Sequence, residues 1–147
     1  MSVKTIYTAH VHTIGGREGA ARSSDNQLDI KLATPGTNRA GTNPEQLFAA
    51  GWSACFEGAL AMVAKQAGIQ LPDETAVDAE VHLHLGEAEG YFLTARLNVS
   101  IPGVPDDVAQ TLIEKAHEVC PYSKMTRSGI DASVALSVDQ KEAAAMW

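Results

Sequence analysis

The chain has 147 residues, 45% of them hydrophobic, which is enough apolar material for one domain with a buried core. Its 11 Lys and Arg residues against 18 Asp and Glu residues give a formal net charge of −7, which disfavours binding to nucleic acid and to anionic membranes. The amino-terminal residues contain no apolar run of signal-peptide length, and two cysteines are too few for a disulfide scaffold. We therefore expect a single cytoplasmic domain over residues 1–147.

The amino-terminal part is predicted to form an antiparallel β-meander. Residues 5–13 and 27–33 are rich in β-forming side chains, and turn-forming residues bracket them at 15–16 and 23–26. Arg17 is therefore expected in or beside a turn.

A long helix is predicted after a loop rich in Gly, Pro and Thr at residues 34–42. Asn43 can cap this helix and Pro44 suits its first position. We expect it over residues 44–66, closing near Gly68. Its most apolar stretch carries a Glu near the middle, which indicates a buried core helix rather than a membrane span.

The second half of the chain is predicted to add a β-hairpin, a helix and a strand. Apolar and polar residues alternate over 76–85 and again over 91–101, which is typical of two half-buried strands. The next helix has one apolar face and should end at Cys120, because Pro121 follows. Alternation over residues 132–138 predicts a final strand, so the fold class is α+β.

Cys55 and Cys120 are the first candidates for chemistry. Both are predicted to point inward from long helices, so contact between them is permitted, although from spacing alone each thiol is better explained as a buried core residue. A thiol becomes a nucleophile when a cation or a helix N-terminus stabilises its thiolate, and Arg17 and Arg22 are candidate cations. Glu45 can hold an arginine through a bidentate pair, but on a continuous helix its Cα lies ~15 Å from that of Cys55.

Three motifs together resemble the organic hydroperoxide resistance (Ohr) family of the Ohr/OsmC superfamily. They are Gly-Gly-Arg at residues 15–17, a long stretch over residues 41–56, and His-Glu-Val-Cys-Pro-Tyr-Ser at residues 117–123. Their order and separation match as well, so the resemblance spans nearly the whole chain. It implies an OsmC-like fold and an intertwined homodimer with sites at the interface.

The resemblance also implies a function and a role for four residues. Cys55 would be the peroxidatic thiol that reduces alkyl or lipid hydroperoxides to alcohols, and Cys120 would resolve its sulfenic acid as a disulfide. Arg17 would stabilise the thiolate and polarise the peroxide, while Glu45 orients the arginine. No cofactor or metal is expected to be bound, and dihydrolipoyl groups on a lipoylated protein would be the external reductant.

An apolar substrate site is expected from Leu47, Phe48, Trp52 and Phe56, although these side chains also suit a core. The sequence departs from the family pattern at Trp52, where Tyr is frequent, at residues 38–40, where more glycine is common, and at residues 128–129. None of these departures falls on the four proposed catalytic positions.

Three alternatives stay open. One is an OsmC-type peroxidase with broader peroxide use. Another is a glutaredoxin-like thiol–disulfide exchanger, since residues 120–123 match a monothiol glutaredoxin motif, although that motif belongs after a first strand. The third is a metal-binding module built on the histidine pairs at residues 10 and 12 and at residues 82 and 84.

Overall fold

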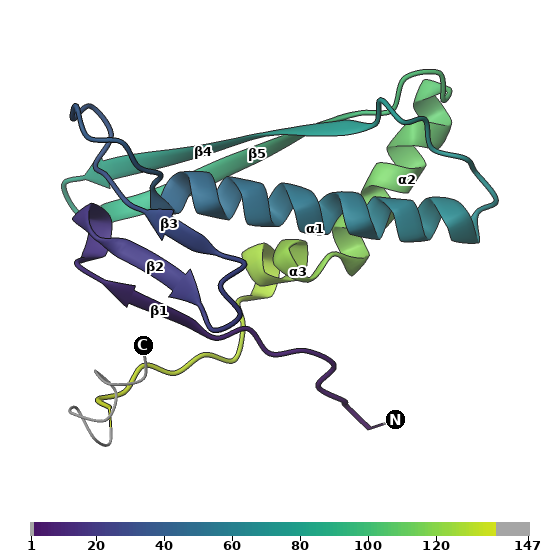
Figure 1. Ribbon diagram of the computed structural model, residues 1–147. Coiled ribbons are helices and arrows are strands. Elements are labelled where there is room, and N and C mark those ends of the chain that lie inside the picture. The colour runs from purple at the N-terminus through teal and green to yellow at the C-terminus, as the bar shows by residue number, and fades with distance from the viewer. Residues whose placement is uncertain (1, 138–147) are drawn as a thin grey trace. The chain divides into compact units, whose positions relative to one another are not determined.

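The structure is a computed structural model that describes residues 2–137, and these form two compact units (Figure 1). One unit comprises the residues up to Pro44 together with the described residues from Ala132 onward, and the other comprises Glu45–Asp131. Each unit contains a sheet of its own. The expectation of one domain over residues 1–147 stays a prediction.

The first unit contains the predicted antiparallel meander. Its three strands are β1 (Val11–Ile14), β2 (Ala20–Ser23) and β3 (Asp29–Lys31), in the order β1-β2-β3. The first strand is shorter than expected, because residues 2–10 belong to no strand. A 3-10 turn, η1 (Gly16–Glu18), joins β1 to β2. Gly15 directly before it and Gly16 at its start have positive φ values of 80° and 59°, which glycine adopts readily. Arg17 therefore lies in a turn, as predicted.

The second unit contains the predicted hairpin of β4 (Ala76–Gly86) and β5 (Gly90–Ser100). The two strands pair antiparallel over their full length, from Ala76 opposite Ser100 to Gly86 opposite Gly90. The alternation seen in the sequence thus sets one apolar face along both strands.

Three helices accompany the hairpin. The long helix α1 (Pro44–Gln66) has the predicted bounds, and α2 (Asp106–Val119) ends directly before Cys120 as expected. A further helix, α3 (Pro121–Ser128), begins immediately afterwards and was not expected from the sequence. Proline is well suited to the first position of a helix, where its missing N–H has no intrahelical partner to lose. Pro121 therefore ends one helix and begins the next.

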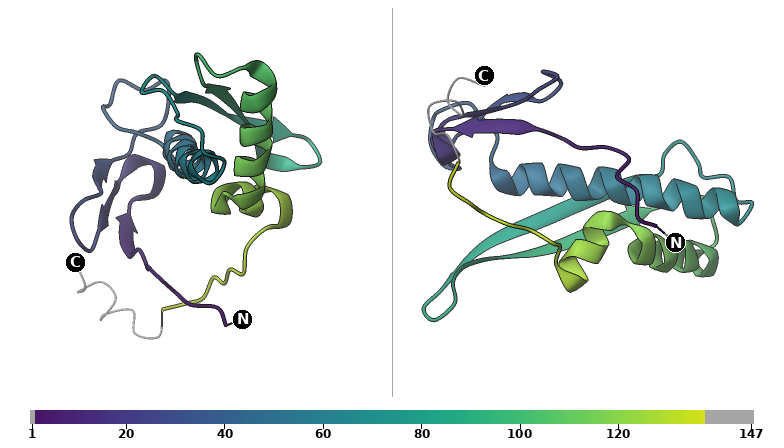
Figure 2. Two further views of the ribbon diagram at one scale, coloured as in Figure 1. Left: turned by 90° about the vertical axis from the view of Figure 1, so that its right-hand side faces the viewer. Right: turned by 90° about the horizontal axis from the view of Figure 1, so that it is seen from below.

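The core of the second unit lies where α1 packs along the hairpin and against α2 (Figures 1 and 2). Its most buried members come from α1, from the end of β5 and from α2: Trp52, Phe56, Ala59, Leu60, Val63, Ala64, Ile101, Leu112, Ala116 and Cys120. By length and composition α1 is also apolar enough to cross a membrane, the one such helix in the described chain. The apolar side chains on one side of α1 are those that form the core of the second unit.

The predicted final strand is not present over residues 132–137, and Val138 lies outside the described residues. Within the described part of the chain, residues 132–137 join no sheet. Alternating side chains favour an extended segment, but a strand also requires a neighbour for its backbone hydrogen bonds, which the local pattern does not supply.

Candidate active site

The two cysteines lie side by side in the second unit. Cys55 is in the middle of α1, and Cys120 occupies the junction between α2 and α3. Both are free thiols, and the Cys120 thiol donates a hydrogen bond to the sulfur of Cys55 over 3.5 Å. A disulfide bond is about 2.05 Å long, so the sulfur atoms need to approach by only about 1.5 Å to form one. The contact that the sequence merely permitted is present.

The two thiols differ in their access to solvent. Cys120 is 0% exposed, whereas Cys55 is only partly buried. Partial burial raises the pKa of Cys55, a hydrogen bond from the backbone N–H of Tyr122 lowers it, and the neighbouring Cys120 raises it again, for a net upward shift. These neighbours together disfavour the thiolate, which a nearby cation would stabilise.

Aromatic side chains and one buried hydroxyl connect α1 to α3 beside the cysteines. Phe48 stacks on Trp52 with ring centroids 5.7 Å apart and on Tyr122 with centroids 6.4 Å apart. The indole N–H of Trp52 donates a 3.0 Å hydrogen bond to the hydroxyl of Ser123, which is 0% exposed. Tyr122 and Ser123 belong to the motif at residues 117–123, but the sequence indicated no role for them, because their contacts with α1 depend on the helix α3.

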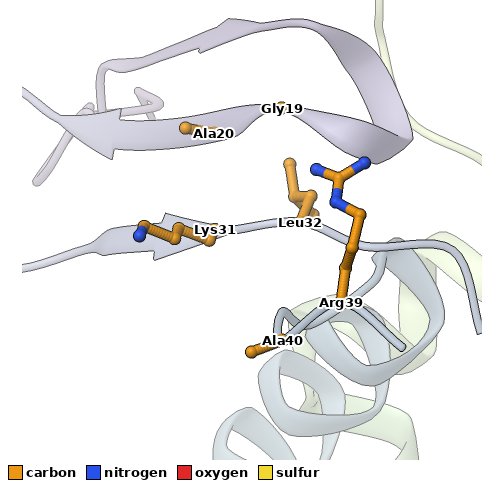
Figure 3. Close-up of a pocket in the computed structure, with 6 residues that line it drawn as sticks. All are labelled: Gly19, Ala20, Lys31, Leu32, Arg39 and Ala40. Carbon is orange, nitrogen blue, oxygen red and sulfur yellow. The ribbon is translucent and has the colours of Figure 1, made fainter. Parts of the chain in front are cut away.

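Arg17 lies in the first unit, in η1, and its side chain is exposed. The residue that follows it, Glu18, holds the turn against the 34–42 loop: its carboxylate pairs with Arg39 and accepts a hydrogen bond from the Thr34 hydroxyl. Arg39 also donates to the Glu18 backbone carbonyl over 2.7 Å, and its guanidinium points toward the turn that precedes Gly19 (Figure 3). The turn that carries Arg17 is therefore tied to this loop.

Glu45 and Arg22 were the remaining charged candidates. Because α1 is continuous from Pro44 to Gln66, Glu45 in its first turn lies ~15 Å along the helix from Cys55 and cannot touch its sulfur. Arg22, on β2, lies 3.8 Å from a carboxylate oxygen of Asp29 on β3. Within the units as described, the structure thus brings Cys55 and Cys120 together, while the roles of Arg17, Arg22 and Glu45 stay predictions.

Comparison with known proteins identifies the family. The OsmC-like protein model matches residues 35–135. The organic hydroperoxide resistance protein of Xanthomonas axonopodis pv. citri is 48% identical over 139 residues, covering 91% of this chain and 96% of that protein. This chain belongs to the organic hydroperoxide resistance (Ohr) proteins of the OsmC-like family. The Ohr protein OhrA of Bacillus subtilis is 47% identical over 135 residues, covering 88% of this chain and 94% of its own.

The fold agrees with that of solved Ohr structures. The crystal structure of OhrB from Bacillus subtilis matches with a TM-score of 0.79 at 39% identity, covering 90% of this chain and the whole of that one. The expected OsmC-like α+β architecture is thus confirmed for this Ohr protein.

The side chains expected to bind an apolar substrate occupy two environments in this Ohr protein. Leu47 and Phe48 are partly buried, whereas Trp52 and Phe56 belong to the core. The last two also line a cavity of about 220 Å³ between α1, β5 and α2. Substrate binding by these residues stays a prediction.

The histidine pair on β4 is engaged with its neighbours. His84 shares a 2.7 Å hydrogen bond with Thr94 and stacks on Phe92, while His82 lies 3.7 Å from a carboxylate oxygen of Glu80. Within residues 2–137, no three His, Cys, Asp or Glu side chains are grouped so that they could hold a metal ion.

Proposed function

We propose that the protein is a thiol-dependent peroxidase that reduces organic hydroperoxides to alcohols. The single observation that carries the proposal is the 3.5 Å contact between Cys55 and Cys120 in a chain of the Ohr family. Two free thiols at this distance are prepared for disulfide formation, which is the chemistry that a two-cysteine peroxidase needs.

The difference in exposure supports a different role for each thiol. Cys55 is the more exposed thiol and would be the one that meets the peroxide, whereas Cys120 is fully buried. Cys55 is therefore the peroxidatic cysteine, and Cys120 is the resolving cysteine.

The proposed catalytic cycle has three steps. The Cys55 thiolate attacks the O–O bond and takes one oxygen atom, so the hydroperoxide leaves as an alcohol after protonation and Cys55 becomes a sulfenic acid. The Cys120 thiol then displaces hydroxide from that sulfur, giving a disulfide and water. Two thiol groups of an external reductant restore both cysteines and are themselves oxidised to a disulfide.

Arg17 is proposed to supply the cation that Cys55 requires. Because the pKa of Cys55 is raised mainly by burial, its thiolate needs a positive charge beyond the Tyr122 N–H. The same guanidinium would stabilise the negative charge that develops on the departing oxygen. Glu45 is too far along α1 to act on the sulfur, so its proposed role is to orient the arginine through a bidentate pair.

The substrate and partners follow from the same proposal. Leu47, Phe48, Trp52 and Phe56 would favour alkyl or lipid hydroperoxides over hydrogen peroxide. A dihydrolipoyl group on a lipoylated protein is the proposed reductant, the cytoplasm the proposed location, and a homodimer the proposed assembly.

Cysteine variants test this proposal. With cumene hydroperoxide and dihydrolipoamide, Cys55→Ser should abolish turnover, because no thiol remains to attack the peroxide. Cys120→Ser should still consume one equivalent and then accumulate over-oxidised Cys55. Equal, mild losses in both variants would contradict the assigned roles and indicate that the thiols only fill the core.

A further inference from the structure

A buried hydrogen bond between two side chains joins α3 to α1 next to the cysteines. Trp52 lies three residues before Cys55 on α1, and Ser123 lies three residues after Cys120 on α3. Their 3.0 Å hydrogen bond therefore joins the two cysteine-bearing segments about one helical turn from the sulfur atoms. Trp52 is 7% exposed and Ser123 is 0% exposed, so water cannot readily replace either partner.

Close packing reinforces this attachment on the same side of α1. A Cβ atom added to Gly51 would lie 2.7 Å from the hydroxyl oxygen of Tyr122, so the tyrosine occupies the space that a side chain would take. Phe48 stacks on both Trp52 and Tyr122. The first turn of α3 is thus packed directly on the turn of α1 that precedes Cys55.

The backbone of Cys120 is hydrogen-bonded to both α2 and α3. The carbonyl of Cys120 accepts the Lys124 N–H at 2.9 Å, and its own N–H is bonded to the carbonyl of Ala116 at 2.8 Å. Arg127 ties the other end of α3 to the carbonyls of His117 and Glu118 at the end of α2. The hydrogen bond between the Trp52 and Ser123 side chains connects α3 to the helix carrying Cys55, beside the one from the Tyr122 backbone N–H to Cys55 itself.

We propose that the Trp52–Ser123 hydrogen bond is a positioning device that keeps Cys120 within reach of Cys55 and so favours disulfide closure over further oxidation. This inference rests on the proposed peroxidase function. A Cys55 sulfenic acid has two competing fates: attack by Cys120, or oxidation by a second peroxide to sulfinic acid. Closure depends on the small distance between the sulfur atoms, whereas the second oxidation does not.

The same bond holds the first turn of α3 against the reactive sulfur. The backbone N–H of Tyr122, next to Ser123, hydrogen-bonds to Cys55 and lowers its pKa against the opposing effect of burial. If α3 loosens, this hydrogen bond weakens, and the pKa of Cys55 should rise further.

The test compares Ser123→Ala and Trp52→Phe with the unmodified protein after one challenge with cumene hydroperoxide. The measured quantity is the ratio of Cys55 sulfinic acid to Cys55–Cys120 disulfide, determined by rapid quenching, alkylation and mass spectrometry. Losing one hydrogen bond should slow closure about tenfold and raise this ratio by the same factor. Because the two partners share one bond, the double variant should be no worse than the more affected single variant.

Ser53→Ala is the matched control. Its hydroxyl also lies on α1 but donates to the carbonyl of Ala49 in the same helix at 2.6 Å, so removing it leaves α3 attached. Ser53→Ala should keep the ratio of sulfinic acid to disulfide that the unmodified protein shows. The pH profile of Cys55 alkylation should also stay unchanged in Ser53→Ala, whereas in Ser123→Ala it should move to higher pH.

Two results distinguish the inference from the proposed function. If the unmodified protein forms the disulfide and both folded variants close it equally fast, the positioning role is wrong while the peroxidase stands. If the unmodified protein forms no Cys55–Cys120 disulfide, the proposed function and this inference both fail. Trp52→Phe addresses the same bond from α1, so the question is still answered if Ser123→Ala does not fold.

Discussion

At the scale of single residues, Cys55 combines a reactive position with an unfavourable local environment. Burial raises its pKa, and the N–H of Tyr122 compensates only in part. Since the thiolate and not the thiol is the nucleophile, its reactivity should increase with pH until the group is ionised. A cation near the sulfur would move that increase to lower pH.

Arg17→Ala should therefore shift the alkylation profile of Cys55 to higher pH and lower kcat/KM for cumene hydroperoxide roughly a hundredfold. The comparison is Arg22→Ala, which removes the other candidate cation, an arginine of the same unit that lies beside Asp29. Iodoacetamide alkylation across a pH series and steady-state kinetics measure both effects. An unchanged profile in Arg17→Ala would remove this arginine from the mechanism, and an equal shift in Arg22→Ala would contradict the assignment of the cation to Arg17 alone.

At the residue scale, the sequence predicted part of the candidate site. It identified the two cysteines, but two helices with inward faces only permitted their contact, and burial of each thiol in the core was the better explanation from spacing alone. It gave no role to Ser123, because a buried serine has no periodic pattern and its partner Trp52 lies 71 residues away. The distance of Arg17 and Glu45 from the sulfur is likewise a tertiary property that no local spacing encodes.

At the scale of elements, the successful predictions rested on residues that begin a helix and on the alternation of apolar and polar side chains along a strand. Pro44 marked the start of α1, and alternating side chains set the hairpin register. Helix α3 was not predicted, because Pro121 was interpreted only as the residue that ends α2, whereas it is also the first residue of α3. The segment 132–137 was overpredicted because alternation describes the two faces of a strand but not its neighbour.

Two glycines of α1 provide a matched test of how α3 packs on it. A Cβ added at Gly58 meets no atom within 4 Å, whereas one added at Gly51 approaches Tyr122 to 2.7 Å. Gly58→Ala should therefore stabilise the protein by about 1 kcal/mol through helix propensity. Gly51→Ala should lose that gain, because the tyrosine ring must move. Chemical denaturation measures both, and an equal gain at the two positions would contradict the packing of α3 on α1.

At the scale of the whole molecule, the hairpin exposes an apolar face that suggests how two copies associate. Leu83 is 46% exposed, Leu93 directly opposite it is 47% exposed, and Leu85 and Tyr91 beside them are 68% and 73% exposed. These four side chains point to one face of the paired strands, since residues two apart and residues directly opposite share a face. Exposed apolar patches of this kind mark interaction surfaces.

We predict that the protein forms the proposed homodimer and that this face lies in its interface. Leu83→Glu should raise the dimer dissociation constant at least about a hundredfold, because it would bury an unpaired charge. The control is Thr94→Glu, one residue along β5 from Leu93 and therefore on the opposite face. Sedimentation velocity over a concentration series measures the assembly. A dimer that tolerates Leu83→Glu as well as Thr94→Glu would exclude this face.

A stoichiometric titration with peroxide tests whether Cys55 and Cys120 form one redox pair. The reduced protein, with two free thiols per chain, is mixed with one equivalent of cumene hydroperoxide, and the thiols and the intact mass are measured. We expect both thiols to disappear, cumyl alcohol to form in equal amount, and the chain to become lighter by two hydrogen atoms through a Cys55–Cys120 link. Thiols that survive, or a disulfide that joins two chains instead, would contradict the account.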